Sequence, residues 1–208
     1  MAAFCAALVL LCGLGARAQE GIPPRRLGIR WQGSVPQLTF SARDLVNEEV
    51  RKKLRSGLPQ TIELKILALQ KGKQPVAVTA RSCRVVYDLW EDVYRVQIQT
   101  PRKDRSVLVR SLDDVLDRCV VARHMQVGRT EDWDGRSDQR VHFAVLVEFN
   151  PMSQHTVERI RRWLARPTGG RGFEGDAFFG SFVGIFVNRR LGDAERAIRF
   201  RSQPIAVP

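Results

Sequence analysis

Residues 61–88, TIELKILALQKGKQPVAVTARSCRVVYD, carry the pattern that decides the fold. Apolar side chains occupy every second position from Ile62 to Ala68, which is the period of a strand that turns one face to a core. The KGK at residues 71–73 interrupts this pattern as a turn would, and residues 75–88 resume it as a long return strand. We therefore expect an antiparallel hairpin here.

The following segments extend this hairpin. Residues 93–99 alternate in the same way, and residues 104–110 read as a short partner strand. Because the links between successive strands are short, an antiparallel meander is expected. Further strands are predicted at residues 35–42, 140–150 and 196–207.

Residues 140–150, RVHFAVLVEFN, form the clearest strand of the chain. Apolar side chains alternate along one face from Val141 to Phe149. Leu146 belongs to the other face, which indicates that this second face is partly covered too.

Helices are predicted between the strands, each with a polar residue as its N-cap. The N-caps are Asp44, Ser111 and Ser153, for helices at residues 44–57, 111–123 and 153–166. The apolar segment 176–190 suits either a helix or a strand, and its length favours a helix.

These elements predict an α+β protein. It would be a curved antiparallel β-sheet of about six strands with three or four packed helices. One domain over residues 35–208 is expected, since no repeat or second boundary interrupts the pattern.

The start of the chain matches an export signal. The apolar run from Ala2 to Leu14 is shorter than the roughly 20 residues of a spanning helix, and it suits a signal peptide. Small residues at Ala16 and Ala18 place cleavage before Gln19, so residues 1–18 are predicted to be a signal peptide. Two alternatives stay open, an uncleaved anchor and lipid attachment at Cys12.

A periplasmic or secreted location follows from this prediction. After cleavage, no transmembrane segment is expected. Residues 19–34, which contain Pro23 and Pro24 and show little periodicity, are predicted to be a flexible leader.

Cysteine usage fits export. Cys5 and Cys12 lie in the predicted signal, and Cys83 and Cys119 remain. Both remaining cysteines lie on apolar faces, of a strand and of a helix, and an even pair in an exported protein predicts a disulfide. The alternative is two buried thiols.

The formal net charge is +12 at pH 7, from 34 Lys and Arg against 22 Asp and Glu. Such basicity is typical of proteins that bind a polyanion or an anionic membrane. However, the basic residues are spread along the chain, which weakens this interpretation. No nucleic-acid partner is expected of an exported protein.

Few residues carry a recognisable chemistry, so no catalytic, cofactor-binding or metal-binding residue is predicted and no cofactor is expected. GRGFEG at residues 170–175 matches a dinucleotide fingerprint in letters but follows a helix and not a strand. The remaining candidates are interpreted as solvated or structural. They are His124, His142, His155 and the acidic loop with Asp132, Asp134 and Asp138.

One further spot combines an aromatic residue with acids. Glu91 and Asp92 follow Trp90 between two predicted strands. A pair of carboxylates can serve as acid and base, but an exposed hairpin turn is the simpler interpretation.

Four motifs suggest a family. They are SGLPQTIELKI (56–66), VVYDLWEDVYRV (85–96), SLDDVLDRC (111–119) and HFAVLVEFNPMSQHTVERIRRWL (142–164). With them, residues 35–167 resemble an uncharacterised proteobacterial family of exported proteins, a domain of unknown function. The chain departs from that pattern where Val85 and Val86 replace Leu-Ser and where residues 176–195 look inserted. The resemblance implies export and a β-rich fold, and it brings no catalytic residue.

The favoured function is therefore a non-catalytic binding domain of the bacterial envelope, with a protein or another envelope component as partner. One alternative is a hydrolase or other enzyme whose site is assembled from distant residues. The other is a binder of anionic lipid or polysaccharide surfaces.

Overall fold

The computed structural model describes residues 22–70, 75–151 and 194–208. Antiparallel strands dominate, with three short α-helices among the described residues. The predicted α+β class is confirmed, and the strands divide into two sheets, one of seven strands and one of three. The predicted signal peptide, the third predicted helix (153–166) and segment 176–190 lie outside the described residues.

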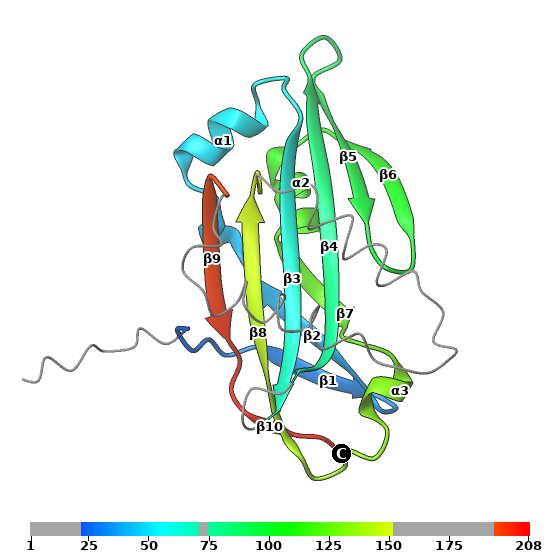
Figure 1. The fold of residues 1–208 in the computed structure, drawn as a ribbon. Helices are drawn as coiled ribbons and strands as arrows, with labels where there is room; N and C mark the ends of the chain where they lie inside the picture. The colour runs from blue at the N-terminus through cyan, green and yellow to red at the C-terminus, as the bar shows by residue number, and fades with distance from the viewer. Residues whose placement is uncertain (1–21, 71–74, 152–193) are drawn as a thin grey trace, which may run out of the picture.

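The seven-stranded sheet has the order β10-β8-β3-β4-β5-β6, and β9 also pairs with β8. The predicted hairpin and meander are its centre, because β3, β4, β5 and β6 follow one another in sequence and in space (Figure 1). Its strands are β3 (Gln60–Gln70), β4 (Pro75–Asp88), β5 (Val93–Gln99), β6 (Asp104–Val109), β8 (Arg140–Phe149), β9 (Arg196–Arg201) and β10 (Ile205–Ala206).

The three-stranded sheet has the order β1-β2-β7 and runs across the long strands behind them in Figure 1. It consists of β1 (Gly28–Gln32), β2 (Val35–Ser41) and β7 (Val121–Gln126). Two predictions need correction here. Residues 28–32 were expected in a flexible leader, but they pair with β2 from Val35 to Thr39. Residues 121–123 were expected in a helix, but they start a strand.

The core fills the space between the two sheets. Ile62, Leu64, Ile66 and Ala68 of β3 all lie in it, as the alternation predicts. Aromatic rings join the layers, with the centroids of Phe40 on β2 and Phe200 on β9 lying 5.5 Å apart. Such edge-to-face contacts add to the apolar burial that holds the sheets together.

The helices in the described residues pack against this core with their buried side chains. They are α1 (Glu48–Leu54), α2 (Leu112–Cys119) and α3 (Thr130–Trp133). Ser111 caps α2 as predicted, accepting a hydrogen bond from the Asp114 amide at 3.0 Å. The N-cap of α1 is Asn47 and not Asp44, since the Asn47 side chain accepts from the Val50 amide at 3.1 Å.

Asp44 instead lies in a 3-10 turn (Arg43–Leu45) and pairs with Arg25 at 2.6 Å. The acidic loop around Asp132, which was interpreted as solvated, contains α3. Its Trp133 is buried, because the indole ring packs against Trp31 and Phe143.

The predicted disulfide is present. It joins Cys83 on β4 to Cys119, the last residue of α2, with the two Cα atoms 5.7 Å apart. The bridge therefore fixes the end of this helix to the centre of the large sheet.

The second face of the large sheet is buried as well. Leu146 is fully buried, as are Leu67 and Ala144 beside it. The indication given by Leu146 in the sequence is confirmed. The same face holds three charged side chains, described below.

Candidate functional site

The turn between β4 and β5, at the top of Figure 1, presents apolar side chains to solvent. Trp90 is 97% exposed and Leu89 is 64% exposed. Leu58, just before β3, is 65% exposed at the same end of the sheet. Clustered exposed apolar residues mark interaction surfaces more often than single ones do. We call Leu58, Leu89 and Trp90 the apolar tip.

The turn is held by its own hydrogen bonds. The Asp88 carboxylate accepts from the backbone amides of Trp90 at 3.0 Å and of Glu91 at 3.2 Å. Asp92 has a φ of 52°, a conformation that Asp tolerates better than most residues. The hydroxyl of Tyr87 donates to the Asp92 carboxylate across the base of the turn. Trp90 is thus exposed on a constrained loop.

Charges reinforce the same turn. Arg95 on β5 lies 3.2 Å from Asp88 and 3.5 Å from Glu91. The backbone amide of Glu91, followed by the Arg95 guanidinium, lowers the pKa of Asp88. Asp88 is therefore ionised at neutral pH and keeps accepting both backbone bonds.

A glycine lets the Leu89 side chain lie close to the backbone next to Leu58. Gly57 has a φ of 78°, which favours glycine, and a Cβ there would lie 3.1 Å from Cδ1 of Leu89. Leu89 therefore lies against the backbone that leads directly into Leu58. The segment that follows α1 and the β4–β5 turn therefore lie side by side.

Sequence reasoning found part of this surface. Trp90, Glu91 and Asp92 were interpreted as an exposed hairpin turn, and the structure places them in one. Leu58 was missed, because its proximity to Leu89 depends on the pairing of β3 with β4.

The other residues singled out in the sequence do not gather into a site. Asp132 caps α3 by accepting from the Arg129 amide at 2.7 Å. His142, half-buried on β8, has a pKa lowered by burial and by Arg201. His124 lies exposed on β7, while His155 and residues 170–175 lie outside the described residues. Within the described ranges, no three His, Cys, Asp or Glu side chains are grouped to hold a metal ion.

A buried triad of titratable groups lies on the second face of the large sheet. Glu63 on β3 lies directly opposite Glu148 on β8. The Lys65 ammonium lies 2.8 Å from Glu63 and 2.6 Å from Glu148. Burial raises the pKa of Glu63, although Lys65 opposes the shift. All three side chains are 4–5% exposed, so a dissolved substrate has no access to them in this structure.

No helix in the part of the chain that the structure describes is long and apolar enough to cross a membrane. The resemblance of residues 35–167 to an exported family stays a prediction. Comparisons with family models, with curated proteins and with solved structures find no match to this chain.

Proposed function

We propose that this protein is an exported, non-catalytic binding domain that docks onto a partner protein through the apolar tip. One observation carries the proposal: Trp90 is 97% exposed on a turn that hydrogen bonds already hold in place. Trp is the residue type most enriched among binding hot spots. A constrained turn also loses little conformational entropy on binding.

The side chains around Trp90 indicate the partner's chemistry. Asp88, Glu91 and Asp92 place three carboxylates beside the indole, and the Arg95 guanidinium pairs with Asp88 and Glu91 only, in a chain whose net charge is +12. A matching partner has an apolar pocket for the indole and basic side chains at its rim. An anionic membrane surface fits less well, since the carboxylates would be repelled. A second copy of the chain would bring acidic turn against acidic turn.

The export part of the proposal is supported by the Cys83–Cys119 disulfide, because disulfides persist in oxidising compartments. We propose a periplasmic or secreted location with an envelope protein as partner. N-terminal sequencing of the product made in its own cell is expected to begin at Gln19. An intact Met1 on a cytosolic product would contradict this part alone.

A photo-crosslinking residue in place of Trp90 tests the docking surface directly. In the producing cell, we expect one discrete adduct with another protein, identified by mass spectrometry. The matched control carries the same crosslinker at Leu108 on β6, which is 60% exposed outside the turn. Equal adducts from both positions, a dimer of the chain, or no adduct at position 90 would each overturn the proposal.

With that partner purified, Trp90→Ala is expected to weaken binding about thirtyfold. Truncating a hot-spot Trp costs about 2 kcal/mol or more, and each 1.4 kcal/mol corresponds to roughly tenfold in affinity. Trp90→Phe should lose less, since it keeps an aromatic ring, and Leu108→Ala should change little. Isothermal titration calorimetry measures all three. If Leu108→Ala lowered the affinity as much as Trp90→Ala does, the binding surface would not be the β4–β5 turn.

A further inference from the structure

A cleft with a volume of about 300 Å³ opens between the two sheets, on the side of β5 and β6. We call it the arginine cleft, because four arginines line it. Its lining comes from β4, β5, β6, α2 and β7 and from Thr100: Arg81, Ile98, Thr100, Arg105, Asp117, Arg118, Val121, Arg123 and Met125. The cleft shares no residue with the apolar tip.

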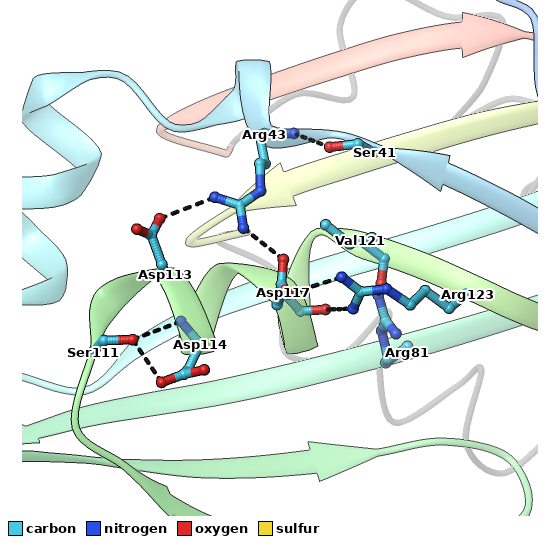
Figure 2. A network of polar contacts seen from close by, with 9 residues as sticks. All are labelled: Ser41, Arg43, Arg81, Ser111, Asp113, Asp114, Asp117, Val121 and Arg123. Carbon is cyan, nitrogen blue, oxygen red and sulfur yellow. Dashed lines mark hydrogen bonds and ion pairs between the residues drawn. The ribbon is translucent and has the colours of Figure 1, made fainter.

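The charges of the lining do not cancel. Four guanidinium groups face one carboxylate, that of Asp117. This carboxylate is already occupied, since it pairs with Arg43 at 2.5 Å and with Arg123 at 2.8 Å (Figure 2). The lining therefore holds a net positive charge that no residue of the lining neutralises.

Arg81 is the least exposed arginine of the group. It enters the core face of β4, opposite Leu64 of β3. Its Nη2 donates to the carbonyl oxygens of Cys119 at 3.1 Å and Val121 at 2.9 Å, close to the position of Arg123 (Figure 2). Its Nε is buried and has no hydrogen-bond partner. Burial, assisted by Arg105, lowers the pKa of Arg81 to about 10, so it is still a cation at neutral pH.

Two more arginines are available at the cleft. Arg105 and Arg118 are exposed, and among the described residues no hydrogen bond or ion pair engages either guanidinium. Arg105 lies close enough to Arg81 for the two cations to repel each other. Such a placement is unfavourable by itself and becomes favourable when an anion lies between the groups.

A purely structural role explains only part of this arrangement. Arg81 lies at the C-terminal end of α2, where a cation is favoured by the helix dipole and by the free carbonyls. That accounts for the two backbone bonds of Arg81. The same dipole also favours Arg118, the basic residue in the last turn of α2. It does not account for Arg105, which lies on β6 and faces the same space.

We propose that the arginine cleft binds a phosphate monoester group carried by a small polar substituent. Guanidinium groups match phosphate oxygens with paired, charge-assisted hydrogen bonds. A volume of about 300 Å³ exceeds what a bare phosphate fills and falls at the lower end of small-molecule sites. Ile98 and Met125 supply apolar contacts for the carbon skeleton of this substituent.

Isothermal titration calorimetry of the full chain tests the site, with ribose 5-phosphate and inorganic phosphate as probes and ribose as the uncharged control. We expect saturable binding of ribose 5-phosphate, weaker binding of phosphate and none of ribose. The affinity should fall as salt rises, because exposed charges are screened.

Variants of the exposed arginines locate the binding without disturbing the core. Arg105→Gln and Arg118→Gln should each weaken ribose 5-phosphate binding about tenfold, since a hydrogen bond to a charged group is worth roughly 1.5–3 kcal/mol. The matched control is Arg84→Gln, exposed on the opposite face of β4, which should leave binding unchanged. An equal fall in affinity in all three variants would show that binding depends only on the net charge of the protein, and it would overturn the site.

A second arm distinguishes a soluble phosphate from a lipid headgroup. Vesicles of phosphatidylcholine with one fifth phosphatidic acid present the same monoester on a membrane. Binding to these vesicles that is lost in Arg105→Gln, together with weak binding of ribose 5-phosphate, would assign a lipid. No saturable binding in either arm would overturn the proposal. The Trp90→Ala variant should bind these probes normally, so this test is independent of partner docking.

Discussion

Replacing Lys65 with Met is expected to destabilise the fold by about 3–5 kcal/mol, measured by urea unfolding at pH 7.5. The reason is the surroundings of Lys65 on the second face of the large sheet. Its ammonium lies between the carboxylates of Glu63 and Glu148, and all three side chains are 4–5% exposed. Removing the cation leaves two facing carboxylates in the interior with no compensating charge.

The loss should depend on pH in a defined direction. Burial already raises the pKa of Glu63, and loss of the opposing Lys65 raises it further. A carboxyl group with a raised folded-state pKa stabilises the protein below its unfolded pKa, and this stabilisation is lost as pH rises through the folded value. The difference between Lys65→Met and the wild type should therefore be larger at pH 7.5 than at pH 5.

Two controls separate buried charge from loss of side-chain volume. Lys53→Met removes an exposed ammonium that pairs with Glu195 at 2.6 Å, and it should change stability little. The triple variant Glu63→Leu, Lys65→Met, Glu148→Leu should recover most of the lost stability, because apolar replacements of buried ion pairs are often neutral or better. A pH-independent loss in Lys65→Met would show that the triad is not a buried ionic cluster.

The same triad shows where sequence reasoning reaches its limit. Alternation along residues 61–70 correctly predicted the core face of β3. It also implied that Glu63 and Lys65 point to solvent, but both are buried. Their partner Glu148 is 83 residues away from Lys65 in sequence. A pattern within one strand carries no information about such a partner.

Local pairing explains what was predicted well. β3 to β6 are consecutive hairpins, so short-range alternation and turns were sufficient to define them. β1 and β7 were missed because each depends on β2, which lies between them in the sheet. β1 is short, and only Ile29 and Trp31 form its inward face, both of them partly exposed. Its strand structure comes from pairing with its neighbour.

The candidate sites follow the same division. The exposed turn with Trp90 was visible, because it joins two strands that are adjacent in sequence. The arginine cleft was not, because it draws residues from β4, β5, β6, α2 and β7. In the sequence these arginines are indistinguishable from the other basic residues spread along the chain. The disulfide was predictable, because an even pair of cysteines remains after the predicted signal and both lie on apolar faces.

Removing that disulfide gives the second large expected effect. The double variant Cys83→Ser, Cys119→Ser should lose about 2–4 kcal/mol of unfolding free energy. The bridge closes a loop with a sequence separation of 36, and without it the unfolded chain gains conformational freedom. Both cysteines are 1% exposed, so the serine hydroxyls would also lie in an apolar setting. Wild-type protein with the bridge reduced lacks the cross-link but carries no buried serine, so its stability separates the two effects.

The bridge also positions the arginine cleft, so its loss should be felt there. Arg81 donates to the carbonyl of Cys119, the residue that the disulfide fixes against β4. We expect the double serine variant to bind ribose 5-phosphate more weakly than the wild type even at temperatures where it is fully folded. Urea unfolding and calorimetry on the same samples test both effects. Unchanged stability, together with free thiols at both positions in the wild type, would show that the bridge does not form.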